Sequence, residues 1–234
     1  MEKKIIDLCC GGRMFWYQKH HPQTEYVDQR SGRWCLGTYP VKAGRKKRYF
    51  QIAPTLKADF RHLPLATAQF QLAIFDPPHL LHVGVNSWLC KKYGKLSDHW
   101  QDDLLTGFQE AQRVLQPTGI LLFKWNDEDL PLSTWQDLLP SQPLFTAQRQ
   151  KTHWLVFANS PSAVARVAVY DPQQTFHYET PVATCTQNNF VSLLNQQRIL
   201  FVKTDPTTLP WFLQQQPLLG DRQGQNRFLC FFKP

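Results

Sequence analysis

Short apolar runs alternate with an amphipathic stretch along the first 160 residues, a pattern typical of an α/β domain. Residues 100–115 carry apolar side chains at helical spacing, which predicts a helix with one buried face. A second, short helix is expected at 134–139. The runs that predict buried strands lie at residues 4–9, 25–28, 70–75, 120–125 and 152–158. This order predicts a Rossmann-like, mostly parallel sheet with helices on both faces.

The composition changes at Asn159-Ser160-Pro161-Ser162, beyond which the chain is rich in Gln, Asn and Pro. We therefore predict a first domain over residues 1–160 and a small C-terminal α+β module over residues 161–234. Substrate recognition and partner binding both remain open as roles for this module. Its expected strands are 167–170, 199–203 and 228–232, and its expected helices lie near 190–197 and 210–216.

Positive charge is concentrated near the start of the chain. The net charge is +8, from 26 Lys and Arg against 18 Asp and Glu, and residues 1–60 hold 12 of these bases but 5 acids. The peak is the run Arg45-Lys46-Lys47-Arg48, followed by Tyr49-Phe50. Cations followed by rings suit a phosphate backbone with bases to stack on, although a solvated surface loop is the alternative. The connection from Ser31 to Lys57 is long, which is typical of functional or disordered loops.

Length and composition exclude several classes of protein. A chain of 234 residues that is 42% hydrophobic can bury a core, so it is neither a disordered polyelectrolyte nor a disulfide-stapled miniature. No apolar run is long enough for a membrane span, and the N-terminus does not have the pattern of a secretory signal. Six cysteines without a CxxC pair, and histidines without ligand spacing, predict no metal site and a cytoplasmic setting.

Candidate chemistry falls at the ends of the predicted strands, where open parallel sheets bind ligands. Asp7 and Cys9 lead into Gly11-Gly12, which lets a backbone approach a ligand closely. Asp28 follows Asp7 by 21 residues, the spacing of an acid that binds a ribose diol. Further along are Asp59 with Phe60, suited to an adenine edge, and the tetrapeptide Asp76-Pro77-Pro78-His79.

In this order, the motifs resemble class I S-adenosylmethionine-dependent methyltransferases. The closest likeness is to amino-group enzymes with a (D/N/S)PP(Y/F/W) signature, which modify adenine N6 or cytosine N4, and to small phage or prophage proteins among them. The resemblance covers about residues 1–160. It is carried by the stretches DLCCGGRMFW, ADFRHLPL, FDPPH, NSWLCKKYGKL and RVLQPTGILLFKW.

The resemblance implies S-adenosylmethionine as cofactor and assigns residues to it. The catalytic residues it implies are Asp76, Pro77, Pro78 and His79. The cofactor-binding residues it implies are Asp7, Cys9, Gly11, Gly12, Asp28, Asp59 and Phe60. The chain departs from the pattern in two places, because its loop has fewer glycines than usual and His79 replaces the usual aromatic residue.

The tetrapeptide suits the chemistry of an exocyclic amine, whose lone pair is delocalised into the base. A carboxylate oxygen of Asp76 and the carbonyl of Pro77 can each accept one N–H, which frees that lone pair for attack. Proline at positions 77 and 78 restricts the backbone around that carbonyl. His79 can then stack on the target base, which in a duplex must first be flipped out.

Cations follow the tetrapeptide at Lys91, Lys92 and Lys95, mixed with rings. With Arg45–Arg48 they are the predicted nucleic-acid-binding residues, although a basic helix end is the alternative interpretation. We predict a nucleic-acid partner, DNA in preference to RNA, and no membrane. Two other functions remain open: methylation of glutamine or another amino group in a protein, and a binding protein on a methyltransferase scaffold.

Overall fold

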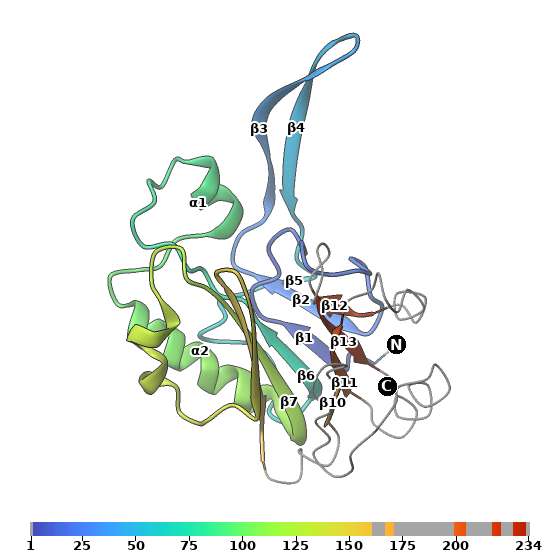
Figure 1. Cartoon of the computed structure of the whole chain (residues 1–234), viewed down its shortest axis with the longest axis vertical. Helices are drawn as coiled ribbons and strands as arrows, with labels where there is room; N and C mark the ends of the chain where they lie inside the picture. Colours follow the sequence, from blue (N-terminus) through green and yellow to red (C-terminus); the bar gives the residue numbers. More distant parts are fainter. Residues whose placement is uncertain (1, 161–166, 171–198, 205–216, 221–226, 233–234) are drawn as a thin grey trace.

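A seven-stranded sheet forms the centre of the computed structural model, which describes residues 2–160, 167–170, 199–204, 217–220 and 227–232 (Figure 1). Its strand order is β5-β2-β1-β6-β7-β9-β8. The strands are β1 (Ile5–Asp7), β2 (Thr24–Asp28), β5 (Leu56–Lys57), β6 (Phe70–Phe75), β7 (Leu115–Asn126), β8 (Phe145–Arg149) and β9 (Thr152–Ala158). All run parallel except β9, which is antiparallel to both its neighbours. The predicted mostly parallel, Rossmann-like sheet is confirmed.

The strands that sequence predicts are those buried on both faces. Every residue of β1 is buried, and β6 and β9 have the predicted bounds. Strand β7 begins at Leu115 rather than Ile120, and β8 was not predicted. Strands covered on both faces consist of continuous apolar runs, which explains why these positions are readable in the sequence.

The two faces of the sheet are covered differently. Helix α2 (Trp100–Val114), which confirms the predicted helix, buries Leu104 and Phe108 against one face. Two short 3-10 turns, η1 (Leu132–Thr134) and η2 (Gln136–Leu138), take the place of the expected second helix. On the other face, the apolar cluster includes Leu219 and Cys230 from the C-terminal segment. The described residues thus place α2 on one face of the sheet and this C-terminal segment on the other.

Four described segments after residue 160 form a second, small sheet in the order β10-β11-β13-β12. They are β10 (Val167–Tyr170), β11 (Ile199–Thr204), β12 (Leu219–Gly220) and β13 (Arg227–Phe232), and they confirm the three predicted strands. The helices expected near 190–197 and 210–216 lie outside the described residues. Leu219 makes an antiparallel bridge with Trp16, and Gly220 N–H donates to the Phe15 carbonyl at 3.2 Å. The C-terminal segment thus forms backbone contacts with the residues that follow Gly11-Gly12.

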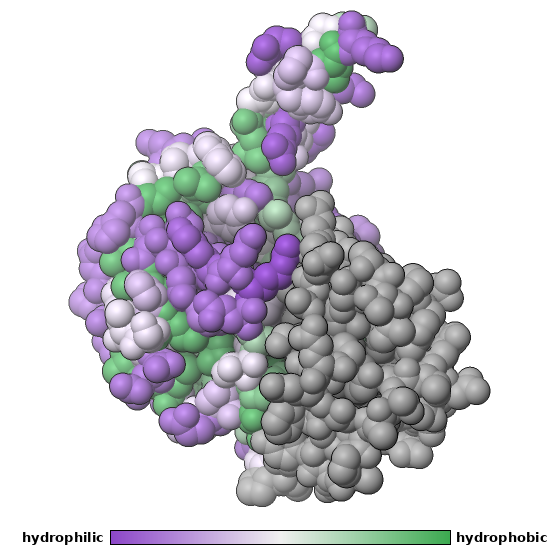
Figure 2. Space-filling model, viewed as in Figure 1, coloured by the Kyte–Doolittle hydropathy of each residue, from purple (hydrophilic) through white to green (hydrophobic). Residues whose placement is uncertain are grey.

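The long connection after β2 is an ordered hairpin rather than an irregular loop. Strands β3 (Gly32–Val41) and β4 (Gly44–Ile52) pair antiparallel and project from the body at the end of the sheet where α1 (Trp88–Tyr93) lies (Figure 1). Figure 2 shows hydrophilic residues gathered at the far end of this hairpin. Within the described residues, no helix is both long and apolar enough to cross a membrane.

Candidate functional site

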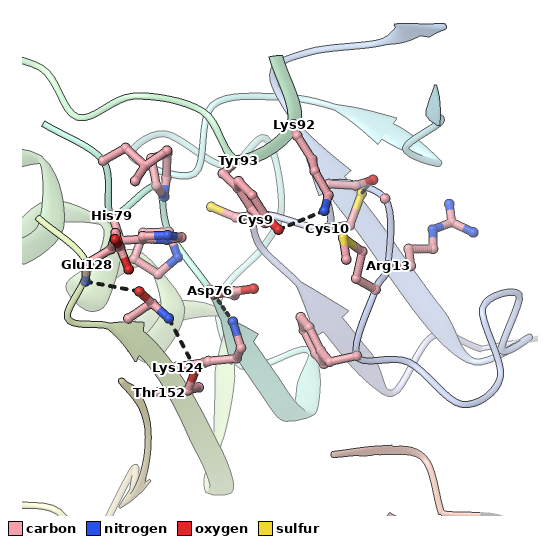
Figure 3. A pocket seen from close by; sticks show the side chains of 18 of the residues that line it. Cys9, Cys10, Arg13, Asp76, His79, Lys92, Tyr93, Lys124, Glu128 and Thr152 are labelled. Atoms are coloured by element: carbon pink, nitrogen blue, oxygen red, sulfur yellow. Dashed lines mark hydrogen bonds and ion pairs between the residues drawn. The ribbon is translucent and has the colours of Figure 1, made fainter. Parts of the chain in front are cut away.

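A cavity of about 620 Å³ lies where the strand order reverses, between β1 and β6. Such a switch point is where open parallel sheets bind ligands, beyond the carboxyl ends of the strands. The loops that follow both strands line the cavity, so the structure brings the glycine loop and the tetrapeptide together (Figure 3). The predicted site residues that line it are Cys9, Gly11, Gly12, Asp76, Pro77, Pro78, His79 and Lys92.

Asp76 is held in the cavity by a lysine from the neighbouring strand. Lys124 of β7 donates from Nζ to Asp76 Oδ1 at 2.8 Å, and both side chains are largely buried (Figure 3). No described residue donates a hydrogen bond to the other carboxylate oxygen of Asp76 or to the carbonyl of Pro77. The second carboxylate oxygen of Asp76 and the carbonyl oxygen of Pro77 are therefore two neighbouring acceptors for a ligand that carries two N–H groups.

Two rings lie on the α1 side of the cavity. The helix begins after Ser87, whose Oγ accepts from Cys90 N–H, and ends at Gly94 with φ +81°. A Cβ at Gly94 would lie 2.9 Å from Pro78 Cγ, so this close approach also needs glycine and seats α1 against the tetrapeptide. The Tyr93 and His79 ring centroids are 5.6 Å apart.

His79 is mostly enclosed by its neighbours, and its ring also lies near Trp125. Burial lowers the pKa of His79, with the Asp76 carboxylate opposing that shift. The imidazole is therefore neutral at pH 7 and offers an uncharged ring face beside Tyr93. A flat, uncharged ligand such as a nucleobase can stack there without meeting a histidine cation.

The glycine loop leaves its backbone open to the cavity. Gly11 has φ +46°, and a Cβ there would have no atom closer than 4.0 Å, whereas a Cβ at Gly12 would collide with the Phe50 ring of β4. Burial raises the pKa of the Cys9 and Cys10 thiols, so both stay protonated at neutral pH. These cysteines serve as small side chains in a packed loop rather than as nucleophiles.

Asp28 lies at the end of β2, beneath an arginine. Its carboxylate accepts from Gly11 N–H at 3.0 Å and from Arg30 through N–H, Nε and Nη2 at 2.9, 3.0 and 3.1 Å. A carboxylate has about four acceptor positions, so these donors saturate it. Arg30 lines the cavity and Asp28 does not. The predicted contact of Asp28 with a ribose diol is therefore not open in this arrangement, because Arg30 and Gly11 occupy the carboxylate.

Asp7 lies buried beneath the loop instead of lining the cavity. Trp16 donates from Nε1 to its Oδ2 at 2.7 Å, and the carboxyl has no solvent exposure. Burial raises the pKa of Asp7 to about 8 in spite of this hydrogen bond, and the nearby Asp76 carboxylate adds to the rise. Asp7 is thus largely protonated at neutral pH and supports the loop from below.

Stability should fall as the pH rises, because of Asp7. Its pKa rises from 3.8 to about 8 on folding, so above pH 4 the folded state keeps a proton that the unfolded state has released. The free energy of unfolding should then drop by about 1.4 kcal/mol per pH unit between about pH 5 and pH 7. Asp7→Asn keeps an acceptor for Trp16 and should remove that slope in urea unfolding curves. Equal slopes in both proteins would contradict this prediction.

Asp59 and Phe60 lie away from the cavity. Arg61 Nη2 binds Asp59 Oδ2 at 2.6 Å and lowers the pKa of that carboxyl, while its Nη1 reaches Asp103 at 2.8 Å. The Phe60 ring packs beside Phe75, at a centroid distance of 5.3 Å. The predicted adenine contact is therefore not formed by these side chains as they stand.

The predicted cations divide between two elements. Arg45–Arg48 are exposed, lie on β4 of the projecting hairpin (Figure 1) and do not line the cavity. Lys91 and Lys92 form the last turn of α1, and Lys92 alone of the two lines the cavity, with Nζ 2.7 Å from the Tyr93 hydroxyl. Lys95 is exposed just beyond the helix.

Several cavity residues escaped the sequence analysis. Lys124 had a usable signal, because a lysine inside the apolar run 120–125 needs a partner. Arg30, Phe50 and Gly220 had none, since their place depends on the hairpin and on the C-terminal strand β12. The described residues contain no cluster of three or more His, Cys, Asp or Glu placed to hold a metal ion.

Three solved structures resemble the chain, all at low sequence identity. The PH0226 protein of Pyrococcus horikoshii OT3 is 12% identical, covering 100% of this chain and 83% of its own, with a TM-score of 0.33. A variant of the 16S rRNA (adenine(1408)-N(1))-methyltransferase from Catenulisporales acidiphilia, crystallised with its cosubstrate SAM, is 13% identical, with coverages of 100% and 87% and a TM-score of 0.30. An S-adenosylmethionine-dependent methyltransferase from Mesorhizobium loti is 14% identical, with coverages of 98% and 90% and a TM-score of 0.28. No protein-family model and no curated protein sequence matches the chain. Likeness at this level transfers no activity.

Proposed function

We propose that the protein transfers a methyl group from S-adenosylmethionine to an exocyclic amino group of a nucleic-acid base, adenine N6 or cytosine N4 in DNA. One observation carries this proposal. Asp76 Oδ2 and the Pro77 carbonyl have no donor among the described residues, and both residues line the cavity that the glycine loop shares. Two neighbouring acceptors match the two N–H groups of a base amine.

The cavity residues fit the proposed cofactor. The volume of about 620 Å³ lies within the range of small-molecule sites, and Gly11 leaves open space in front of its backbone. Cys9 to Gly12 would hold the cofactor, with Asp28 available to the ribose when Arg30 swings away. When bound there, S-adenosylmethionine supplies an electrophilic methyl group.

The chain's own residues activate the amine by orientation. Asp76 Oδ2 and the Pro77 carbonyl accept its two N–H groups, which draws the nitrogen toward a pyramidal geometry and frees its lone pair. Lys124 fixes the carboxylate through Oδ1, so that Oδ2 keeps its direction. The neutral His79 ring and the Tyr93 ring receive the face of the base, which leaves its duplex at a cost of a few kcal/mol.

A parallel acceptor assay tests the proposal. Wild-type protein receives S-adenosylmethionine labelled in the methyl group, together with unmethylated DNA, RNA or a cell-protein extract, and label is counted in each pool. We expect label in DNA, since Lys92 of α1 lines the cavity and the exposed cations Arg45–Arg48 lie farther out on the hairpin. Label in protein would favour a glutamine-type acceptor, and label in no pool would favour a binding protein; either result would overturn the proposal.

Lys124 should be a positioning residue for this reaction. Lys124→Met keeps the length of the side chain and removes the ion pair with Asp76, so the carboxylate can rotate away from the amine. We expect kcat to fall about tenfold with an unchanged affinity for S-adenosylmethionine, and Lys124→Arg to restore part of the loss. Single-turnover kinetics and equilibrium binding separate the two effects. A fall in cofactor affinity with unchanged kcat would contradict the assignment.

A further inference from the structure

The outer part of the β3–β4 hairpin projects from the body of the protein (Figure 1). Every residue from Gly37 to Tyr49 is exposed, although the two strands remain paired up to Val41 and Gly44 (Figure 1). A lone two-stranded hairpin is only marginally stable in water. Because Gly37 to Tyr49 are exposed, both faces of this hairpin are available to a partner.

The charge of the hairpin is uniform in sign. Between Gly32 and Ile52 the chain has six Lys and Arg residues and no Asp or Glu. Five of the six lie between Lys42 and Arg48, at the far end. A long element with cations and no acids complements a polyanion, and its attraction to one increases at low salt.

The cations lie on both faces of the ribbon. Successive residues of a strand point to opposite faces, so Lys46 and Arg48 share the face of Phe50, while Arg45 and Lys47 share the other. Rings accompany both sets. Tyr39 pairs with Lys46 on one face, and on the other the Arg33 guanidinium lies 4.0 Å from the Tyr49 ring centroid. A flat anionic surface would contact the cations on only one face of the hairpin. A groove with phosphates on both walls can contact the cations on both faces at once.

We propose that this hairpin is an arm that enters the major groove of B-form duplex DNA. That groove is about 12 Å wide and admits a two-stranded ribbon, whereas the minor groove is about 6 Å wide and the major groove of duplex RNA is deep and narrow. The inference deepens the proposed function, on which it rests for a nucleic-acid acceptor, and it specifies a double-stranded DNA substrate.

The arm starts at the wall of the catalytic cavity. Phe50 of β4 lines the cavity and lies against Gly12, while the strand continues outward to Gly44, roughly 20 Å at ~3.3 Å per residue. Helix α1, with Lys91 and Lys92, lies near the same end of the sheet (Figure 1). A duplex held by the arm would thus lie beside the opening that receives the flipped base.

Binding measurements without cofactor test the arm separately from catalysis. The probes are a duplex DNA, a duplex RNA and a single-stranded DNA of the same sequence, titrated between about 50 and 200 mM salt. Lys46→Gln with Lys47→Gln removes one cation from each face, and Lys19→Gln with Lys57→Gln is the matched control at exposed positions outside the hairpin. We expect wild-type protein to bind duplex DNA at least about tenfold more tightly than either other probe. The arm variant should lose close to two units of salt slope, and the control variant none.

Dimethyl sulfate footprinting identifies the groove. Guanine N7 lies in the major groove and adenine N3 in the minor groove. Wild-type protein should protect N7 and leave N3 reactive, and the arm variant should protect neither. Protection of N3 alone, equal affinity for duplex RNA or single strands, or an unchanged salt slope in the arm variant would overturn the inference.

If DNA is methylated but the arm variant binds normally, the inference fails and the proposed function stands. If the arm binds duplex DNA but no pool takes up label, the proposed function fails and the inference about the arm stands.

Discussion

Replacing Asp76 with alanine is expected to reduce methyl transfer at least 100-fold, the order of loss seen when an oriented hydrogen-bonding group is removed from a transition state. The substitution deletes the oxygen that would accept the amine N–H, and it leaves Lys124 without its carboxylate. Affinity for S-adenosylmethionine should change little, because the loop Cys9–Gly12 is untouched. Single-turnover label transfer and equilibrium cofactor binding measure the two quantities.

The matched control for this prediction is Asp98→Ala, which removes an exposed carboxylate. It should retain wild-type transfer. Asp76→Asn keeps one acceptor oxygen, which Lys124 would occupy, so the amide NH2 would face the substrate amine in place of Oδ2 and we expect the variant to remain strongly impaired. Full turnover by Asp76→Ala would show that the tetrapeptide is not the catalytic element.

Trp16→Ala is expected to destabilise the folded protein strongly. Trp16 has no solvent exposure, its ring centroid lies 5.0 Å from that of Tyr26, and its indole N–H binds Asp7. Truncation of a buried tryptophan costs about 3–5 kcal/mol in unfolding free energy. The bridge from Trp16 to Leu219 also places it between the glycine loop and the C-terminal strands, so cofactor affinity should fall as well.

Urea denaturation measures the effect of Trp16→Ala, and Trp88→Ala is the matched control. Trp88 is 52% exposed, so its truncation should change the unfolding free energy by less than about 0.5 kcal/mol. Equal losses in the two variants would mean that Trp16 is not a central packing residue. If Trp16→Ala lost stability but bound the cofactor as tightly as wild type, the contact between Trp16 and Leu219 would not support cofactor binding by the glycine loop.

The parts of the fold that could be predicted are those in which sequence pattern and burial coincide. Strands β6 and β9 are apolar along their length, and α2 repeats apolar residues at helical spacing, so local pattern alone locates them. The hairpin β3–β4 escaped because neither face of its outer half is buried. Without a buried face, a strand has no apolar alternation to detect.

The site was predictable in its chain order but not in its side-chain partners. Glycines after β1 and the tetrapeptide after β6 meet because parallel strands end at one edge of the sheet. The ion pairs of Arg30 with Asp28 and of Arg61 with Asp59 could not be predicted. Each depends on the side-chain conformation of the arginine two residues after the aspartate, which the sequence does not give. The same holds for Gly220, which reaches the cavity through a strand more than two hundred residues from Cys9.

The most direct measurement is to identify the methylated atom. Duplex DNA is incubated with the protein and S-adenosylmethionine bearing a deuterated methyl group, then digested to nucleosides and analysed by mass spectrometry. The geometry of Asp76 and Pro77 predicts deuterated N6-methyladenine or N4-methylcytosine, absent when Asp76→Ala replaces the wild type. A deuterated methyl on a ring carbon, or equal product from both proteins, would contradict it.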